Sequence, residues 1–250
     1  MLLVSDVHGA FDALAEVAAA GETLLVLGDL LNFVDYRTLD GMLAEVAGKE
    51  FVAQLTGLRT RGDHAAAHDL WAEFGAGRET EIRERYDELT RAAYGEAAAA
   101  LAGSHAFVTY GNVDRPDLLR DMVPEGVTFV DAGVFDIEGL VVGIVGGGVP
   151  SLGVPGEVAH DAMADRLSTL GPVEMLCTHV APAVRQLSTD VIGGRPKQSV
   201  PVLEYLREHR PRWHYFGDIH QPQATTWRVG KTICRNVGYF RATRRPVRHG

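Results

Sequence analysis

Near its N-terminus the chain reads LLVSDVHG over residues 2–9, a short apolar run followed at once by an acidic and an imidazole side chain. Four other apolar runs end in a carboxylate, amide or imidazole, at TLLVLGD (23–29), AFVTYGN (106–112), VEMLCTH (173–179) and WHYFGDIH (213–220). Continuous apolar runs of this length are typical of strands that are buried on both faces of a sheet. Further strands are indicated by the runs at 127–131, 140–146, 225–229 and 231–240.

Helical patterns separate several of these runs, at residues 10–20, 156–170 and 199–209. Strands that alternate with helices predict an α/β sheet domain. The segment 36–101 differs, because it shows hardly any strand signal and is rich in Ala, Glu, Arg and Leu. We therefore expect a single domain over residues 1–250 with a helical insertion at about 36–101. The inserted helices either pack on the sheet as ordinary layers or form a lid or a dimer interface, which would make the protein a homo-oligomer.

The composition narrows the class of protein. The 250 residues are 46% hydrophobic and 23% charged, which excludes wholesale disorder and collagen-like or coiled-coil character. The net charge of −9 argues against a general affinity for nucleic acid or for an anionic membrane. No stretch approaches the roughly 20 apolar residues of a membrane span, and the N-terminus lacks the basic leader of a signal peptide. We expect a cytoplasmic protein without nucleic-acid or membrane partners, and with Cys177 and Cys234 as reduced, buried thiols.

The polar ends of the five runs point to a binding site. In α/β sheets, ligands bind at the carboxyl ends of the strands. The i, i+2 spacing of Asp6 with His8, and of Asp218 with His220, points both members of each pair to one side of an extended backbone. Together these ends predict a metal site, and its candidate ligands are Asp6, His8, Asp29, Asn112, His179, Asp218 and His220.

The order of these motifs, D-x-H, G-D, G-N, H and G-x-x-H, resembles that of the calcineurin-like metallophosphoesterase family. Gly28-Asp29 and Gly111-Asn112 are close to the family's forms, as is the first motif, and Asn236 opens an Asn-Val-Gly where the family often carries Asn-Pro-Gly. The resemblance covers essentially the whole chain apart from the helical insertion. It implies an α/β fold of the family's type, a four-layer α-β-β-α sandwich with two mixed sheets.

The resemblance also implies two divalent metal ions and a phosphoesterase activity. The first ion would be held by Asp6, His8, Asp29 and His220, and the second by Asp29 as a bridge, Asn112, His179 and Asp218. Mixed imidazole, carboxylate and amide ligands suit Mn, Fe, Zn or Ni, of which we favour Mn. A hydroxide bridging the two ions would attack the phosphorus of a small phosphoester in line, with Asp29, Asn112 and His179 as catalytic residues.

Two positions depart from the family's pattern. Asp218 stands where the family usually has the first His of Gly-His-x-His; it either adds a negative charge to the second ion's ligands or does not bind, leaving one ion. Val113 stands where the family commonly has a His that acts on the leaving group. The absence of this histidine predicts a bias toward esters with good leaving groups, unless another histidine supplies the proton. The candidates are His160, and His64 and His68 from the insertion.

Substrate contacts are less strongly indicated. Asn32 either positions water or phosphate or forms a turn. Residues 231–250 carry basic side chains and no acid, and they form either an anion contact or a solvated tail. Arg235 and Arg241 flank the Asn-Val-Gly loop and are the better candidates for binding a substrate phosphate, since Arg matches phosphate in a bidentate fork. We expect Asp114, which would orient the missing His, to pair with Arg115 or with backbone groups instead.

The sequence therefore predicts a binuclear metal-dependent phosphoesterase, and a phosphodiesterase rather than a monoesterase. A protein or nucleotide phosphatase is the alternative among enzymes. A metal-binding scaffold with little turnover is the alternative outside enzymes, because Val113 and Asp218 both depart from the family's pattern.

Overall fold

The computed structural model describes residues 1–151, 153–191 and 196–250. The chain divides into two compact units, a larger one of Met1–Leu31 with Tyr94–Gly250 and a smaller one of Asn32–Ala93. The predicted α/β sheet structure is found in the larger unit, and the predicted helical segment begins in the smaller one. That the helical segment is an insertion in a single domain stays a prediction.

The first sheet of the larger unit contains the strands that lead to Asp6, Asp29 and Asn112. Its strand order is β11-β1-β2-β3-β4, and β11 runs antiparallel to β1 while all the other pairs are parallel. Its strands are β1 (Leu2–Val4), β2 (Leu24–Leu27), β3 (Ala106–Thr109), β4 (Val127–Phe129) and β11 (Val247–Arg248). Because the three central strands are parallel, their carboxyl ends meet at one edge of the sheet.

The second sheet contains the strands that lead to His179 and Asp218. Its order is β5-β6-β7-β8-β10-β9, parallel in the centre and antiparallel at both edge pairs. Its strands are β5 (Ala132–Ile137), β6 (Leu140–Val145), β7 (Met175–Thr178), β8 (Trp213–Phe216), β9 (Thr226–Val229) and β10 (Thr232–Asn236). Both sheets are mixed, as the sequence resemblance implied.

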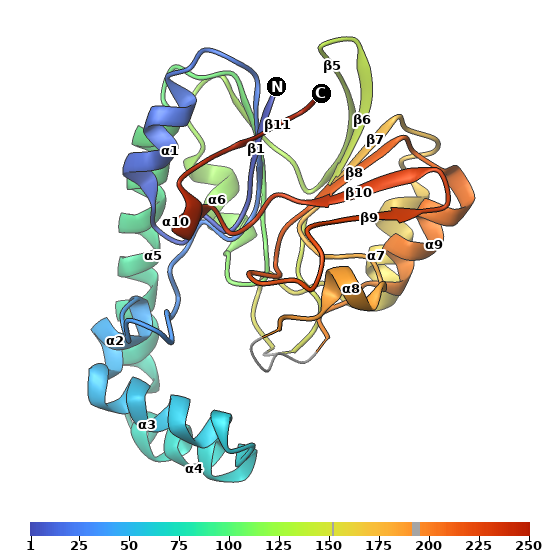
Figure 1. Cartoon of the computed structure of the whole chain (residues 1–250). Coiled ribbons are helices and arrows are strands. Elements are labelled where there is room, and N and C mark those ends of the chain that lie inside the picture. Colours follow the sequence, from blue (N-terminus) through green and yellow to red (C-terminus); the bar gives the residue numbers. More distant parts are fainter. Residues whose placement is uncertain (152, 192–195) are drawn as a thin grey trace. The chain divides into compact units, whose positions relative to one another are not determined.

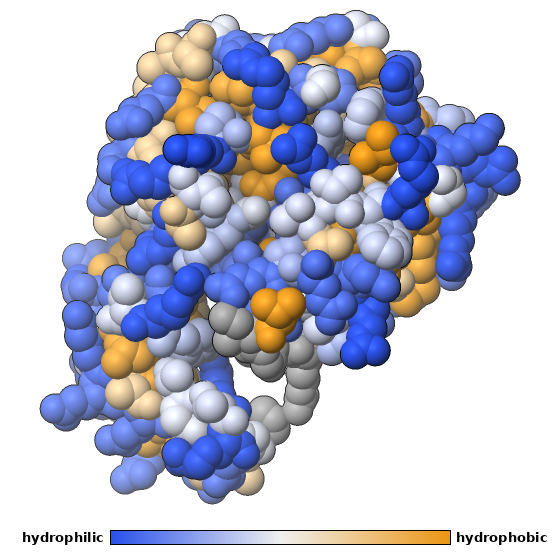
Figure 2. Space-filling model, viewed as in Figure 1, coloured by the Kyte–Doolittle hydropathy of each residue, from blue (hydrophilic) through white to orange (hydrophobic). Residues whose placement is uncertain are grey.

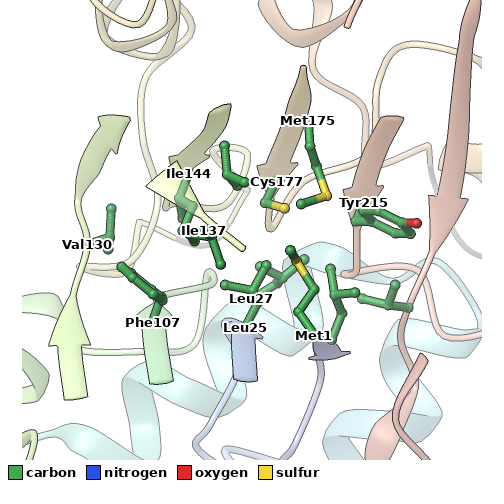
Figure 3. Close-up of a cluster of buried hydrophobic side chains, with 13 residues drawn as sticks. Met1, Leu25, Leu27, Phe107, Val130, Ile137, Ile144, Met175, Cys177 and Tyr215 are labelled. Carbon is green, nitrogen blue, oxygen red and sulfur yellow. The ribbon is translucent and has the colours of Figure 1, made fainter. Parts of the chain in front are cut away.

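The two sheets pack face to face over an apolar core (Figure 3). Leu25 and Leu27 of β2 and Phe107 of β3 lie opposite Ile144 of β6 and Cys177 of β7. This packing explains the continuous apolar runs, because one face of each central strand meets the other sheet and the opposite face meets helices. Cys177 and Cys234 are both buried free thiols, as expected.

Helices cover the outer face of each sheet (Figure 1). Beside the first sheet lie α1 (Phe11–Ala18) and α6 (Pro116–Met122), and beside the second lie α7 (His160–Ser168) and α9 (Val200–His209). Two short helices, α8 (Arg185–Ser188) and α10 (Phe240–Thr243), follow β7 and β10. The fold is therefore the four-layer α-β-β-α arrangement that was expected.

The start and the end of α9 follow from ordinary capping chemistry. The side-chain oxygen of Ser199 accepts a hydrogen bond from the backbone N–H of Val202, at 3.3 Å, and so satisfies one of the unpaired donors of the first turn. Pro201 stands in that same turn, where its missing N–H costs little. The helix ends at His209, and Arg210 takes a left-handed conformation that terminates it.

The smaller unit is helical. It contains α2 (Met42–Ala47), α3 (Lys49–Thr60), α4 (His64–Gly75) and the first part of α5 (Glu79–Leu101). Its own core is formed around Phe51, Val52 and Leu55 of α3, with Trp71 and Phe74 of α4 packed against them. The helical character expected for this segment is confirmed, whereas its use as a lid or dimer interface stays a prediction.

Charged and polar side chains cover most of the face of the molecule shown in Figure 2. Within the described part of the chain, none of the helices combines the length and apolar character that crossing a bilayer requires.

His214 of β8 is a buried histidine that is held neutral. The hydroxyl of Thr178 donates to the carbonyl of Val180 at 2.7 Å, so its oxygen can only accept the 2.9 Å bond from His214, which places the proton on Nε2. The other ring nitrogen, Nδ1, is buried and has no hydrogen-bond partner within the described residues. Burial lowers the pKa of His214 to about 3.

This histidine should make stability depend on acid pH. Its pKa is depressed in the folded chain, so the unfolded chain binds the extra proton once the pH falls below its ordinary value of 6.5. The stability present above pH 6.5 is then lost toward pH 3, with a slope of about 1.4 kcal/mol per pH unit from this residue. Urea unfolding at several pH values between 7 and 4 measures this. The free energy of unfolding should change less steeply with pH in His214→Gln than in the wild type. His68→Gln, an exposed control, should keep the wild-type slope; equal slopes for wild type and His214→Gln would contradict the assignment.

Candidate metal centre

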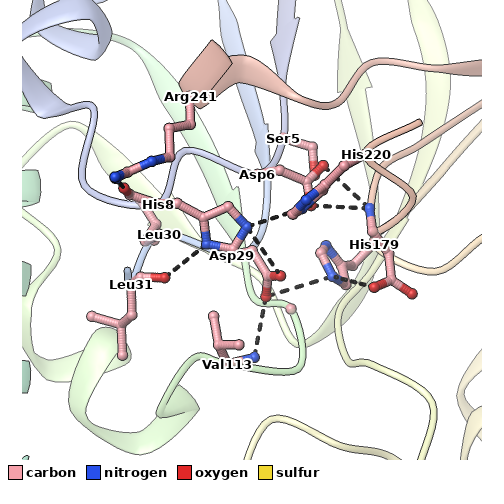
Figure 4. A network of polar contacts seen from close by, with 12 residues as sticks. Ser5, Asp6, His8, Asp29, Leu30, Leu31, Val113, His179, His220 and Arg241 are labelled. Atoms are coloured by element: carbon pink, nitrogen blue, oxygen red, sulfur yellow. Dashed lines mark hydrogen bonds and ion pairs between the residues drawn. The ribbon is translucent and has the colours of Figure 1, made fainter. Parts of the chain in front are cut away.

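The candidate ligands follow the carboxyl ends of strands from both sheets, and Figure 4 shows Asp6, His8, Asp29, His179 and His220 pointing toward one another. Asp6 and Asp29 follow β1 and β2 by two residues, and Asn112 follows β3 by three. From the second sheet, His179 follows β7 directly and Asp218 follows β8 by two residues. All five side chains are buried. His8 and His220 stand two residues after Asp6 and Asp218. The seven residues that the sequence indicated therefore all follow strand ends at one edge of the fold.

The chain turns sharply as it leaves these strands. Asp6, Asp29 and Asp218 have φ angles of 58°, 55° and 66°, and His8 has 41°. Left-handed backbone is uncommon for residues other than glycine, and such strain clusters at functional sites. These turns direct the three carboxylates inward instead of letting the strands continue.

Glycines leave room for the ligands to approach one another. A Cβ added at Gly111 would lie 2.6 Å from the ring of His179 and closer still to Asp29 Oδ1. A Cβ at Gly217 would lie 2.6 Å from Asp6 Oδ2. Glycine is thus required beside the ligands for steric reasons, which accounts for the Gly-Asn and Gly-Asp pairs of the sequence.

Asp6, His8, Asp29 and His220 form one group of candidate ligands. His8 Nε2 lies 3.2 Å from His220 Nε2 and 3.7 Å from Asp29 Oδ2, and His220 Nε2 lies 3.6 Å from Asp6 Oδ1. His8 Nδ1 lies 2.9 Å from the carbonyl oxygen of Leu31, which can only accept, so Nδ1 carries the proton. Burial lowers the pKa of His8, and in the neutral ring Nε2 presents a lone pair toward the group.

Asp29 also belongs to a second group, with His179, Asn112 and Asp218. Its Oδ1 lies 3.5 Å from His179 Nε2, which lies 3.9 Å from Asp218 Oδ1. His179 Nδ1 donates to the carbonyl of Leu27 at 2.8 Å, so Nε2 is again the inward-facing nitrogen. One carboxylate is therefore shared between the two groups, as a bridging ligand would be.

Three buried atoms of the second group fit a cation. His179 Nε2, Asn112 Oδ1 and Asp218 Oδ2 have no hydrogen-bond partner within the described residues. Buried polar atoms are nearly always paired, so three orphans on the turns that follow β3, β7 and β8 point to a missing partner. Imidazole nitrogen with amide and carboxylate oxygens is a donor set for divalent transition metals. Asp6, Asp29 and His179 present ligand atoms within 4.8 Å of one another, as do Asp6, His8 and His220.

The electrostatics of the centre are dominated by its carboxylates. Burial alone would raise the pKa of Asp6, but the contact with His220 at 3.6 Å and the charge of His179 hold it well below its usual value. Burial would lower the pKa of His179, but the negative charges of Asp29, Asp218 and Asp6 raise it to about 9. The ring of His179 therefore lies in a strongly negative environment, which also favours a bound cation.

Asp114 holds the turns that present the ligands. Its carboxylate accepts the backbone N–H groups of Asp29 at 2.8 Å, Leu30 at 3.1 Å and Gly111 at 2.9 Å, and also that of Leu31. It therefore joins the turn after β2 to the turn after β3. Of the two pairings expected for Asp114, the structure shows the one with the backbone.

The remaining predicted residues have different surroundings. The backbone N–H of Val113 donates to Asp29 Oδ1 at 3.1 Å, and the guanidinium of Arg241 donates to the carbonyl of His8 (Figure 4). Arg235 is exposed on β10, where it lies opposite Tyr215 of the neighbouring strand β8 in the sheet register.

Asn32 belongs to the smaller unit, where its side chain donates to Asp40 Oδ1 at 3.1 Å, which suits a turn. His160 and His68 are exposed, and the side chain of His64 lies outside what the structure describes.

Sequence reasoning missed two neighbours of the ligands. The ring of Tyr239 stacks on His220 at 4.0 Å and meets His8 edge-on, so it fixes the planes of both imidazoles. Lys197 Nζ lies 2.7 Å from Asp218 Oδ1. Tyr239 directly follows the Asn-Val-Gly motif, which could have indicated it, whereas no pattern in the sequence connects Lys197 with Asp218.

No protein-family model matches the chain, and no curated protein matches it. Solved structures share its fold. One, 18% identical, superposes with a TM-score of 0.56 over 96% of this chain and 90% of its own. The protein TT1561 of Thermus thermophilus is 12% identical and superposes with a TM-score of 0.53, over 98% of this chain and 96% of its own. A protein described as a novel archaeal phosphodiesterase, 10% identical, covers 96% of this chain and 84% of its own, but its TM-score of 0.36 carries no argument. At these identities the likeness shows the fold alone.

The steric argument at Gly111 can be tested directly. In Gly111→Ala the added methyl group would displace Asp29 and His179, so we expect Mn²⁺ affinity to fall at least tenfold while the far-UV circular dichroism stays unchanged. Isothermal titration of the metal-free protein measures this. The matched control is Gly95→Ala, where an added Cβ meets no atom within 4 Å. Equal Mn²⁺ affinities for the two variants would contradict a metal centre at this position.

Proposed function

We propose that the chain is a metal-dependent phosphoesterase that hydrolyses a small phosphodiester. The observation that carries the proposal is the sharing of Asp29 between two groups of inward-facing ligands, at 3.7 Å from His8 and 3.5 Å from His179. Two divalent ions held about 3.5–4 Å apart need such a shared carboxylate. The order of the sequence motifs supports the same conclusion.

The proposed ligands divide as the two groups do. The first ion is assigned to Asp6, His8, Asp29 and His220, and the second to Asp29, Asn112, His179 and Asp218. When bound, the ions lower the pKa of a shared water and neutralise the charge on the phosphoryl oxygens. Mn²⁺ is favoured because the set contains three carboxylates and one amide beside three imidazoles, which is harder than a thiolate-containing set.

The chain's own residues orient this chemistry. The Nδ1–H groups of His8 and His179 are held by the carbonyls of Leu31 and Leu27, so both rings keep their Nε2 atoms directed inward. Asp29 is fixed at both ends, because Asp114 accepts its backbone N–H and the N–H of Val113 donates to its Oδ1. Phosphoryl transfer depends mostly on positioning and charge neutralisation, so a rigid ligand set accounts for most of what is needed.

The leaving group defines the substrate class. Val113 carries no proton donor, so the departing oxygen must leave without help from this position. General acid assistance is worth roughly 10²–10⁴-fold, and its loss favours esters whose alcohol is a good leaving group. We favour a diester because it brings one negative charge, not two, to a centre that already contains three carboxylates. Arg241, beside the carbonyl of His8, is the better placed of the two arginines to contact a phosphate oxygen.

A metal-binding scaffold with little turnover is the second candidate, and the same residue, Val113, favours it. Protein and nucleotide phosphatases remain the alternatives among enzymes, and a panel of substrates separates them from a diesterase.

Hydrolysis of bis-p-nitrophenyl phosphate in Mn²⁺ tests the assignment of Asp29. Asp29→Asn keeps the shape of the side chain but removes the charge between the ions, so we expect kcat/KM to fall at least a hundredfold. Asp117→Asn, an exposed control far from β2 in the chain, should match the wild type. If the wild type shows no Mn²⁺-dependent turnover of any phosphoester in a broad panel, the scaffold is correct and the enzyme proposal is wrong.

Restoring an imidazole at position 113 tests the interpretation of the leaving group. In Val113→His we expect hydrolysis of a phenyl ester to rise about 10- to 100-fold relative to the p-nitrophenyl ester, because only the poor leaving group needs a proton. Val113→Leu fills similar space without a proton and should leave the ratio of the two rates unchanged. The same ratio in both variants would argue against this explanation.

A further inference from the structure

Lys197 contributes a positive charge to the second group of ligands. Its Nζ lies 2.7 Å from Asp218 Oδ1, the same oxygen that lies 3.9 Å from His179 Nε2. The side chain of Asp218 is 1% exposed, whereas that of Lys197 is 43% exposed. The ammonium group therefore reaches the buried carboxylate from the solvent side of the centre.

Asp218 also lies close to the rest of the centre. Its backbone N–H donates to Asp6 Oδ1 at 3.1 Å, and its Oδ1 lies 3.9 Å from His179 Nε2, which lies 3.5 Å from Asp29 Oδ1. Asp6, Asp29 and Asp218 are the three carboxylates assigned to the metal ions. Lys197 and a second divalent ion thus act on the same negative charges.

Asp218 explains why a counter-cation is needed. A neutral imidazole in this position could stay buried without a charged partner, but a buried carboxylate without one is strongly destabilising. Lys197 supplies that partner in the metal-free chain, and Asp218 Oδ2 stays without a hydrogen bond within the described residues. The pair is therefore satisfied by one lysine only in part, which leaves the carboxylate available to a stronger cation.

We propose that Lys197 is a built-in competitor for the second divalent ion, holding Asp218 when that ion is absent and moving toward solvent when it binds. The proposal rests on the proposed function, since it takes Asp218 as a ligand of the second ion. Two cations that share one carboxylate repel each other, and the repulsion is strong where little water screens it. The flexible four-carbon stem of lysine, already half-exposed, allows the ammonium group to leave.

The consequence is a second ion that binds more weakly than the first. The first group contains no lysine among its described contacts, so its affinity is not reduced in this way. Activity of the enzyme would then follow the supply of free metal, because the second ion is gained or lost while the first remains bound.

Titration of the metal-free, full-length protein with Mn²⁺ tests this, by calorimetry and by the electron paramagnetic resonance signal of coupled Mn²⁺ pairs. We expect Lys197→Met to bind the second Mn²⁺ at least about tenfold more tightly than the wild type, with a smaller change for the first. Lys197→Arg, which keeps the charge, and Lys231→Met, which removes an exposed lysine elsewhere, should resemble the wild type. An unchanged or weaker second binding step in Lys197→Met would overturn the proposal.

A second pair of variants guards against a misfolded Lys197→Met. With Asp218→His the carboxylate that needs a counter-cation is gone, so adding Lys197→Met should change the second affinity less than threefold. If Lys197→Met still raises the affinity for the second Mn²⁺ tenfold in the Asp218→His background, the competitor role is overturned.

Failure of the two proposals is distinguishable, because no substrate is used. If all variants bind a single ion, the binuclear centre of the proposed function is wrong, and the competitor role with it. If wild type and Lys197→Met bind two ions with equal affinities, only the competitor role is wrong.

Discussion

The carboxylate of Asp114 is the contact on which the arrangement of the centre depends. It accepts N–H groups from three successive residues, Asp29 to Leu31, and a fourth from Gly111. Two turns from neighbouring strands are thereby fixed to one buried side chain, and Asp29 is directed between His8 and His179. Burial and the charge of Asp29 raise the pKa of Asp114 to about 7, and burial also keeps water from competing for its four N–H donors. Asp114 therefore fixes the backbone of the residue that the proposed centre shares between two ions.

Much of the fold and of the candidate centre could be predicted from the sequence. Strands buried on both faces are continuous apolar runs, and the polar residue that ends each run marks the edge where parallel strands terminate. The same rule fails for β5, whose residues Ala132–Ile137 are partly exposed at the edge of the second sheet, so that no continuous apolar run identifies it. It fails too for β11, whose two residues are too few to form a pattern.

The contacts that the sequence could not predict are those between segments without a shared pattern. Lys197 lies just before α9, outside any helix or strand, so no periodicity in the sequence indicates its contact with Asp218. Tyr239 is different, because the Asn-Val-Gly motif before it marks its position, but no pattern indicates that its ring stacks on His220, 19 positions earlier in the chain. The basic C-terminal stretch shows a further case. Arg244 pairs with Asp12 of α1 and Arg248 pairs with Glu22, so part of the positive charge is matched to acids of the larger unit.

In the proposed binuclear centre, one carboxylate, that of Asp29, lies between two cations. Anomalous diffraction from crystals grown with Mn²⁺ tests it most directly, because the scattering identifies the metal and its position without reference to activity. We expect two peaks about 3.5–4 Å apart, one on each side of Asp29, with His8 and His220 at the first and His179 and Asn112 at the second. A single peak at saturating Mn²⁺, or two peaks that do not share Asp29, would contradict it.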